Sequence, residues 1–254
     1  MSFALPKKPI TLANRNVYNY GMSKNALKSN EILFEDNHLL VINKRAGLVT
    51  QGAAAGQPSL IELAKDYIRK KYNKPGNVYL GIVSRLDAKT SGVIVIARTS
   101  KAAARLNDQF RERSTKKRYW AIVAGKRGEA IADVGQMEDW IIKDEPAMMM
   151  RCLANPRKGA QKAKLSWQVI GRSENRRVLE VVLQTGRKHQ IRCQFASQGF
   201  PILGDKKYGS SLGFPGPGIA LHSQSLEFQH PTKKTELQFE APIPEYWTIA
   251  GYNL

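Results

Sequence analysis

The apolar residues of this chain come in short runs that are separated by turn-forming residues. The run Val93–Ala97 is among the longest, and it falls far short of the roughly 20 residues that a membrane-spanning helix requires. Short apolar runs flanked by Gly, Pro, Asn or Asp are typical of strands in a buried sheet. The pattern therefore excludes a transmembrane protein and favours a globular fold rich in strands.

Helical patterns are interspersed among these strands from residue 31 onward. Helices are expected from residue 60 to the Pro75-Gly76 pair, over residues 101–113 and over residues 189–198. Strands are expected at residues 32–34, 39–42, 78–83, 93–97, 119–124, 163–170, 178–183, 221–229 and 237–240. No repeat or linker divides residues 31–254, so the expected fold class is α+β, a single domain with a mixed, largely antiparallel central sheet flanked by helices.

The charge of the chain is strongly unbalanced. Lys and Arg number 40 against 21 Asp and Glu, a formal net charge of +19, which indicates a polyanionic partner, nucleic acid first and an anionic membrane second. Residues 1–30 contain five basic residues and no acidic one, and we interpret them as a basic N-terminal arm that follows a phosphate backbone. An organelle transit peptide has a similar composition and remains an alternative to a cytoplasmic location.

Cofactor and metal chemistry have almost no support in the sequence. The two cysteines, Cys152 and Cys193, form no C-x-x-C pair, the four histidines show no H-E-x-x-H pattern, and no glycine-rich phosphate motif is present. We therefore expect no cofactor and no metal, and two reduced, partly buried thiols in a cytosol-like compartment.

The polar segment Ser84–Gly92 lies between two of the most apolar predicted strands, and loops held by rigid strands are the usual place of catalytic groups. Asp87, flanked by Arg85 and Lys89, would remain ionised, and an ionised carboxylate can act as a nucleophile toward a sugar carbon. The spacing alone is more often that of a surface ion pair or a turn cap.

Two further segments combine cations with other functional groups. Thr185-Gly186 ends a predicted strand, and the residues after it would open a helix whose first N–H groups face an anion; Arg187, Lys188 and Arg192 add positive charge there. This segment predicts a phosphate site, a carboxylate partner or a solvated helix end. In the predicted strand at 119–124, Tyr119 would point away from Arg118 and Trp120, either into the core or toward a stacked base.

Residues 31–245 resemble the RluA-type pseudouridine synthases, and the resemblance covers four motifs in order. These motifs are Ile32–Asp36 with Leu39–Lys44 and Gly47-Leu48, Arg85-Leu86-Asp87 with Thr90-Ser91-Gly92, Lys117–Ala121, and Thr185–Arg192 followed by Gly199, Pro201-Ile202, Gly204-Asp205 and Tyr208-Gly209. Two positions depart from the family pattern: Ser84 stands where the family usually has His, and Arg45 stands where it usually has Pro.

The resemblance implies a pseudouridine-synthase-like catalytic domain over residues 31–254 that isomerises uridine to pseudouridine in ribosomal or transfer RNA. The reaction changes no oxidation state, so it requires neither cofactor nor metal. The resemblance also implies that Asp87 is the nucleophile, attacking either ribose or base, that Arg192 pairs with it, and that Tyr119 stacks on the uracil and handles a proton.

The remaining site residues would contact the RNA. Ile191 would form an apolar floor under a flipped-out base, and Arg85 would fill the gap that the base leaves. Further substrate contacts are expected from Thr90, Ser91, Arg187, Lys188 and His189. We expect a monomer without a membrane partner. The alternatives are a catalytically silent RNA-binding or ribosome-assembly factor, against which retention of Asp87, Tyr119 and Arg192 argues, and a glycoside hydrolase, which would need a second carboxylate.

Overall fold

The computed structural model describes residues 26–125, 131–173 and 176–249, so most of the expected arm at residues 1–30 lies outside the described residues. The strands are β1 (Ile32–Glu35), β2 (Leu39–Lys44), β3 (Gly81–Ile82), β4 (Ser91–Ala97), β5 (Lys116–Ala124), β6 (Val134–Asp144), β7 (Met149–Leu153), β8 (Gln161–Ser173), β9 (Arg176–Leu183), β10 (Leu221–Gln229) and β11 (Glu236–Glu240). The helices are α1 (Leu60–Lys71), α2 (Ser100–Glu112), α3 (Gln190–Ser197) and α4 (Glu245–Ile249), with 3-10 turns η1 (Ser29–Glu31) and η2 (Lys206–Tyr208).

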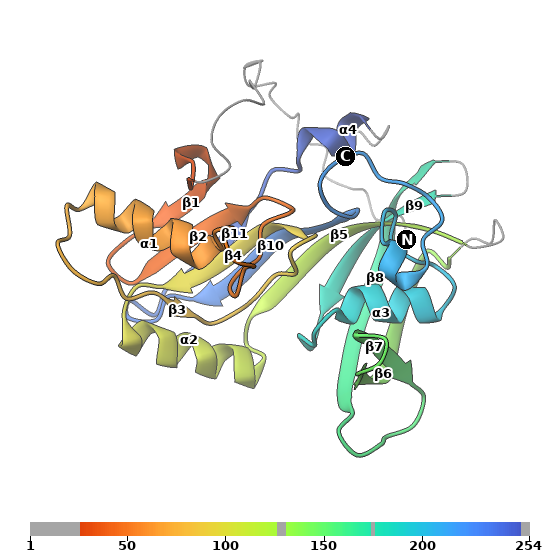
Figure 1. Ribbon diagram of the computed structural model, residues 1–254. Coiled ribbons are helices and arrows are strands. Elements are labelled where there is room, and N and C mark those ends of the chain that lie inside the picture. The colour runs from red at the N-terminus through yellow and green to blue at the C-terminus, as the bar shows by residue number, and fades with distance from the viewer. Residues whose placement is uncertain (1–25, 126–130, 174–175, 250–254) are drawn as a thin grey trace, which may run out of the picture.

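The strands form one sheet whose order is β1-β2-β4-β10-β5-β9-β8-β6-β7, with β11 beside β10 and β3 beside β4. The β4–β10 pair is parallel, and the other strand pairs in the described residues are antiparallel. In Figure 1, β5 runs between two parts of the molecule, one with β1–β4, β10 and β11 and one with β6–β9. The expected α+β fold with a mixed, largely antiparallel sheet is confirmed.

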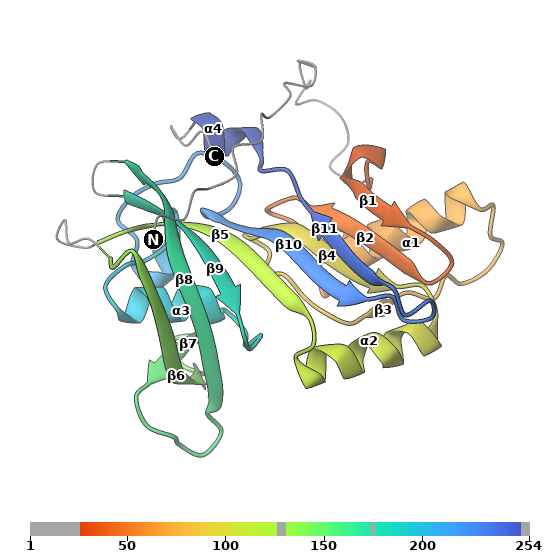
Figure 2. The ribbon, with the colours of Figure 1, turned by 180° about the vertical axis from the view of Figure 1, so that it is seen from behind.

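In the first part, helices cover both faces of the sheet. Leu40 and Ile42 of β2 belong to the core around α1, whereas Leu39 and Val41 belong to the core around α2. Successive residues of a strand point to opposite faces, so a strand buried on both faces is apolar throughout. This double cover explains the uninterrupted apolar run in β4, where all residues are buried. Figure 2 shows the same arrangement from behind.

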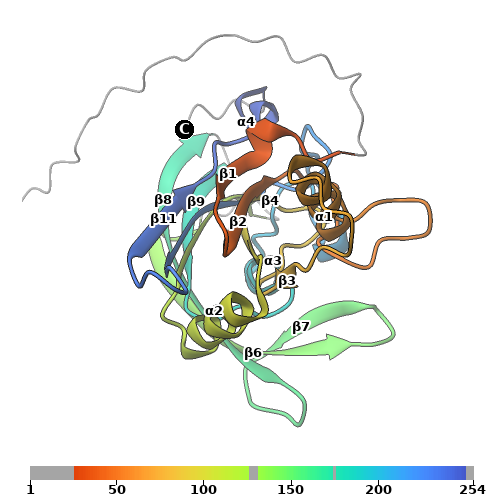
Figure 3. The ribbon, with the colours of Figure 1, turned by 90° about the vertical axis from the view of Figure 1, so that its left-hand side faces the viewer.

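In the second part, α3 packs on β5, β8 and β9 through Ile191 and Phe195, and Trp247 of α4 joins the same core. α3 ends at Ser197, and the chain turns away at Gly199, whose φ of +84° is readily adopted only by glycine. The β6–β7 hairpin extends from the far edge of the sheet, as Figure 3 shows.

The expected helices and strands are confirmed, apart from differences at their ends, and four segments differ more. The strand expected at residues 78–83 is reduced to β3, and β6, β7 and α4 were not expected. Most residues of β6 are exposed or half-buried, so it has little apolar signal of its own and is stabilised by its ladder to β8. No helix in residues 26–125, 131–173 or 176–249 is long and apolar enough to span a membrane.

Candidate active site

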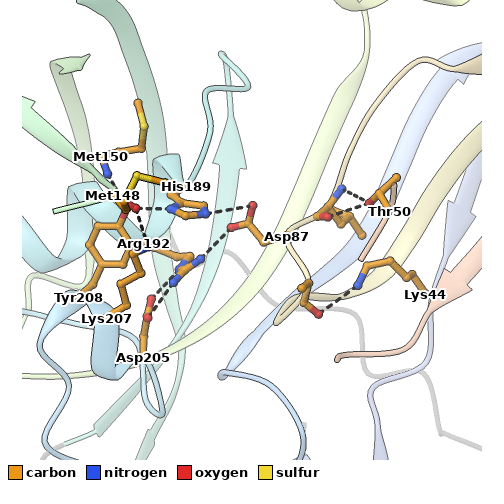
Figure 4. Close-up of polar contacts among 12 residues, drawn as sticks. Lys44, Thr50, Asp87, Met148, Met150, His189, Arg192, Asp205, Lys207 and Tyr208 are labelled. Atoms are coloured by element: carbon orange, nitrogen blue, oxygen red, sulfur yellow. Dashed lines mark hydrogen bonds and ion pairs between the residues drawn. The ribbon is translucent and has the colours of Figure 1, made fainter. Parts of the chain in front are cut away.

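A cavity of about 690 Å³ opens between the two parts of the molecule. One wall is the β3–β4 loop, which carries Asp87, and the opposite wall is the segment from Gly186 to Arg192. Tyr119 of β5 also lines the cavity, so the strand that runs between the two parts contributes to it directly. The fold thus brings the three separate sequence motifs to one site, and Figure 4 shows the polar contacts around it.

Hydrogen bonds to the backbone hold the loop that carries Asp87. The Thr50 hydroxyl donates to the carbonyl oxygen of Leu86 at 2.8 Å and accepts from the Leu86 N–H at 3.3 Å. The ammonium group of Lys44 donates to the carbonyl oxygens of Leu48 at 2.9 Å and Ala88 at 3.4 Å. The residues on both sides of Asp87 are therefore fixed, which positions its carboxylate at the cavity wall.

Lys44 is buried, with 1% of its surface exposed. Burial lowers the pKa of its ammonium group to about 7, against the opposing effect of the Asp87 charge. Backbone carbonyl oxygens accept the hydrogen bonds of the ammonium group. Lys44 therefore supports the loop, and its hydrogen bonds within the described residues go to backbone carbonyls.

A glycine allows the strand after this loop to lie close to its neighbour. Gly92 has a φ of +111°, and a Cβ atom there would lie 2.2 Å from the carbonyl oxygen of Ser223 in β10. Any other residue would push β4 away from β10 at the one parallel pairing in the described sheet. The glycine of the Thr90-Ser91-Gly92 motif thus has a packing function.

Arg192 connects Asp87 to a second, fully buried carboxylate. Its Nη1 atom lies 3.2 Å from Oδ2 of Asp87, while Nε and Nη2 bind the two oxygens of Asp205 at 2.6 and 2.9 Å. Burial alone would lower the pKa of Arg192, but the hydrogen bonds and charges of Asp205 and Asp87 outweigh it and raise the pKa. Asp205 therefore fixes the guanidinium group, which faces Asp87 with its remaining nitrogen.

His189 approaches the other carboxylate oxygen. Its Nε2 atom lies 3.6 Å from Oδ1 of Asp87, and its Nδ1 atom lies 2.9 Å from the hydroxyl of Tyr208. The Tyr208 oxygen also accepts from the backbone N–H of Met150 at 3.0 Å, at the start of β7 (Figure 4). Asp87 thus lies between a guanidinium and an imidazole, one at each oxygen.

Tyr119 is half-buried in the cavity wall. Burial raises the pKa of its hydroxyl to about 12; a hydrogen bond with Ser223 acts in the opposite direction, and the charge of Asp87 adds to the increase. The phenol therefore keeps its proton at neutral pH, which suits it to donate a hydrogen bond or a proton rather than to act as a ready base.

The turn before α3 differs from the expectation. The helix begins at Gln190, and His189 precedes it with a φ of +52°. The N–H of Arg187 binds the side-chain oxygen of Gln190 at 3.0 Å instead of facing an anion. The N–H of Gln190 binds the carbonyl oxygen of Arg187 at 3.1 Å, so neither of these two N–H groups is available to an anion.

The other expected substrate residues divide into two groups. Those that line the cavity are Arg85, Thr90, Arg187, Lys188, His189 and Ile191. Ser91 does not line it: its buried hydroxyl is 2.9 Å from Nδ1 of His222, inside the sheet. Strand alternation explains the difference, because adjacent residues at the start of β4 point to opposite faces.

Sequence reasoning assigned no site role to Asp205, Tyr208, Lys44 or Thr50. Asp205 and Tyr208 lie in the last motif, which signals their importance but not their contacts. Thr50 lies outside the four motifs, and its contact with Leu86 spans 36 positions of the chain. The fold alone reveals that contact.

No group of three or more His, Cys, Asp or Glu side chains arranged to hold a metal occurs within residues 26–125, 131–173 and 176–249. Cys152 and Cys193 are free thiols with their sulfur atoms 3.0 Å apart, and Cys193 is buried while Cys152 is partly exposed. Both cysteines lie within the part of the chain that the structure describes.

Comparisons with known proteins agree with this geometry. Residues 38–197 match the family described as RNA pseudouridylate synthase. The chain is 34% identical over 227 residues to ribosomal large subunit pseudouridine synthase D of Zymomonas mobilis, covering 85% of this chain and 69% of that protein. It is 33% identical over 220 residues to an uncharacterised RNA pseudouridine synthase of Synechocystis, covering 85% of this chain and 66% of that protein. The chain thus spans about two thirds of the length of these relatives.

A solved structure is similar over nearly the whole fold. Human RNA pseudouridylate synthase domain containing 4 superposes with a TM-score of 0.70 and 25% identity, covering 87% of this chain and 91% of that one. The family match spans Asp87, Tyr119 and Arg192, the residues that meet at the cavity. The resemblance noted from the motifs is confirmed, and the chain belongs to the RNA pseudouridylate synthase family of isomerases that act on uridine in RNA.

Proposed function

We propose that this chain converts uridine to pseudouridine in structured RNA, with Asp87 as the nucleophile. The observation that carries the proposal is the position of its carboxylate, which faces a 690 Å³ cavity between Arg192 and His189. A hydrogen bond from a guanidinium group orients a carboxylate, which is a competent nucleophile toward carbon. The cavity volume lies in the usual range of about 300–1,000 Å³ for ligand sites.

The proposed reaction is an isomerisation in which atoms and charge balance. Asp87 forms a bond to the ribose or to the base, and the N1–C1′ bond breaks. The uracil turns, a bond from C5 to C1′ forms, and the bond to Asp87 breaks. C5 loses its proton and N1 gains one, either by direct transfer or by exchange with solvent. Tyr119, protonated at neutral pH, stacks on the base and serves as the donor side of this proton movement. No step requires a cofactor or a metal.

Base flipping is part of the proposal, because the reacting atoms are hidden in stacked RNA. Ile191, which is 4% exposed, lines the cavity and would lie under the flipped base. Arg85 is exposed on the cavity wall, where it can occupy the position that the base leaves. Thr90, Lys188 and Arg187 would complete the contacts around the nucleotide.

A group of cations beside the cavity supports binding to the RNA backbone. A Cβ atom on Gly186 would lie 3.4 Å from the ammonium nitrogen of Lys117, so Lys117 approaches the turn that carries Arg187. Burial and the charges of Arg113 and Arg187 lower the pKa of Lys117. An anion nearby would relieve this repulsion, and a phosphate diester is the anion that RNA supplies.

The substrate class is proposed from the relatives. Several are named ribosomal large subunit pseudouridine synthases C or D, so ribosomal RNA is the first substrate to test and transfer RNA the second. Residues 1–30 are proposed to form a basic arm on this RNA and residues 31–254 the catalytic domain. We also propose that the chain acts as a monomer in the cytoplasm.

Mapping pseudouridine in ribosomal and transfer RNA incubated with and without the protein tests this function. We expect new pseudouridine at defined uridines, and the same yield in excess chelator on a short substrate that folds without magnesium. Unchanged RNA in both classes would contradict the proposal and favour a catalytically silent RNA-binding or ribosome-assembly factor. Loss of activity with chelator, restored by added metal, would contradict the metal-free mechanism.

A further inference from the structure

His189 has an environment that the proposed reaction does not by itself explain. The residue has a φ of +52°, a left-handed conformation that is uncommon outside glycine, and it directly precedes α3. Its side chain is 13% exposed and lies at the cavity wall, with one ring nitrogen toward Asp87 and the other toward Tyr208 (Figure 4). A strained backbone at a cavity points to a ring whose orientation matters.

The hydrogen bonds of Tyr208 determine which nitrogen of His189 carries the proton. The Tyr208 oxygen accepts the Met150 N–H at 3.0 Å, and its own proton needs an acceptor. The acceptor within reach is Nδ1 of His189, 2.9 Å away. An accepting nitrogen carries no proton, so a neutral ring must carry its proton on Nε2.

The opposite tautomer is unfavourable on two counts. A proton on Nδ1 would leave the Tyr208 proton without an acceptor among the described residues. It would also turn the lone pair of Nε2 toward the carboxylate of Asp87, 3.6 Å away. Both penalties disappear when the proton is on Nε2, because an N–H then points at the carboxylate.

The ring is also uncharged under physiological conditions. Burial lowers the pKa of His189 to about 4; the charge of Asp87 acts against this, whereas Arg192, Lys188 and Lys207 lower the pKa further. Arg192 therefore remains the charged partner of Asp87, and the imidazole adds a directed dipole without adding charge.

We propose that His189 is a positioning residue for Asp87, held as its neutral Nε2–H tautomer by the Tyr208 hydroxyl and the backbone of Met150. With Arg192 hydrogen-bonded to one carboxylate oxygen and the imidazole N–H facing the other at 3.6 Å, the carboxylate is oriented before RNA binds. This role rests on the proposed nucleophile, but the tautomer itself can be measured without any reaction. It also makes the β6–β7 hairpin, which carries Met150, part of the support of the active site.

Long-range proton–nitrogen NMR spectra of the imidazole rings, recorded on the full chain without RNA, test the proposal. The chain has four histidines, and the His189 signals are assigned by their loss in His189→Gln. We expect the pattern of a neutral ring protonated on Nε2 from pH 6 to pH 8. A ring protonated on Nδ1, or an imidazolium at pH 7, would overturn the proposal whether or not the chain modifies RNA.

The kinetic test uses Tyr208→Phe, with Tyr72→Phe as the matched control. Tyr72 also loses one side-chain hydrogen bond, to Glu35 at 2.6 Å, but it is not among the residues that line the cavity. Tyr208→Phe removes the hydrogen bonds to His189 and to the Met150 N–H. We expect it to populate both tautomers and to lower kcat roughly tenfold through loss of the bond to His189, with KM for RNA unchanged. A kcat equal to that of Tyr72→Phe, with the tautomer unaltered, would overturn the role of Tyr208.

Two substitutions of His189 distinguish the contributions of its two ring nitrogens to kcat. Gln can place an amide N–H near the position of Nε2, whereas the shorter Asn reaches only the position of Nδ1. We expect His189→Gln to retain a larger part of kcat than His189→Asn. The reverse order would overturn the claim that the Nε2–H is the group that acts on Asp87.

Discussion

The two walls of the cavity are held in different ways. The wall that carries Asp87 is fixed by hydrogen bonds to its backbone from Thr50 and Lys44. The opposite wall is fixed by contacts among side chains, chiefly the bidentate pair of Arg192 and Asp205. The first wall determines where the carboxylate lies, and the second determines the electrostatic field that it experiences.

Because the two walls are held differently, removing a supporting residue from each wall should have different consequences. Removing a side chain that hydrogen-bonds to the backbone releases a loop, and the main effect is a lower free energy of unfolding. Removing one member of a buried ion pair leaves a charge without compensation, which alters both stability and the field at Asp87. The predictions below separate these effects, starting with the residue between the two walls.

Tyr119→Phe should have the largest effect among the changes outside Asp87. A ring that only stacks would tolerate the change, since stacking is worth about 1–3 kcal/mol per base and the ring face is kept. A hydroxyl that moves a proton would not, because general acid–base catalysis supplies roughly 10²–10⁴-fold in rate. We expect normal RNA binding and little pseudouridine in single-turnover assays.

The pKa of Tyr119, raised to about 12 by burial, adds a pH test. The phenol stays protonated through neutral and mildly alkaline pH, so the wild-type rate should show no decline between pH 8 and 9 from its ionisation. Rates of the Phe variant and the wild type that agree within about threefold would identify Tyr119 as a stacking platform, and solvent or another group as the proton carrier.

Asp205→Asn tests the wall held by side chains. Asp205 is 0% exposed, and breaking a buried pair usually costs about 3–5 kcal/mol in the free energy of unfolding. We expect a loss of this size in urea titrations, together with a lower kcat. The matched control is Asp108→Asn, which removes a surface pair with Arg111 and should cost about 0–1 kcal/mol. Equal losses at the two positions would contradict the assigned role of Asp205.

Lys44→Met tests the wall held through backbone. The folded pKa of Lys44, lowered to about 7, lies below its ordinary value of 10.5. Between these values the unfolded chain binds more protons than the folded one, so this group makes stability rise with pH, by up to about 1.4 kcal/mol per pH unit. The loss in free energy of unfolding that comes from burying a charged Lys44 is fully present below pH 7 and disappears above about pH 10.5.

Unfolding measured from pH 7 to pH 9 should therefore show a steeper rise for the wild type than for Lys44→Met. At pH 9 the variant should also be the less stable protein, because it lacks the hydrogen bonds to Leu48 and Ala88. Lys101→Met, at an exposed position, is the control and should keep the wild-type slope. Parallel pH curves for the wild type and Lys44→Met would show that Lys44 is not titrating in this range.

Removing residues 1–25 should have the smallest effect. The deletion takes away Lys7, Lys8, Arg15 and Lys24 but keeps Leu27, which is buried in the core around α1. Each lost phosphate contact reduces the slope of log K against log salt by roughly 0.7–0.9. We expect weaker binding, a shallower slope and an unchanged rate at saturating RNA, and an unchanged slope would exclude this segment from the RNA contact.

The candidate site could be predicted from the sequence only in part. Asp87, Tyr119 and Arg192 could be found because each lies in a motif whose residue types fit its chemistry. The support of Arg192 by Asp205 and the support of Asp87 by Lys44 could not, because they depend on how distant segments pack. Ser91 shows the opposite case: it lies in a motif, but strand alternation directs its hydroxyl to His222 inside the sheet.

The β6–β7 hairpin was missed for a related reason. Its residues are mostly exposed or half-buried, so the periodic signal that identifies buried strands is weak there. Pairing with β8 and the contact between Met150 and Tyr208 place it in the fold, and neither can be read from local sequence.

The most direct test of the central claim is tritium release from RNA labelled at C5 of uridine, compared between the wild type and Asp87→Asn. The amide keeps the shape of the carboxylate but cannot act as a nucleophile. We expect release by the wild type and none by the variant, with RNA affinity in gel-shift assays within a few fold. Substantial turnover by Asp87→Asn would contradict the assignment of Asp87 as the nucleophile.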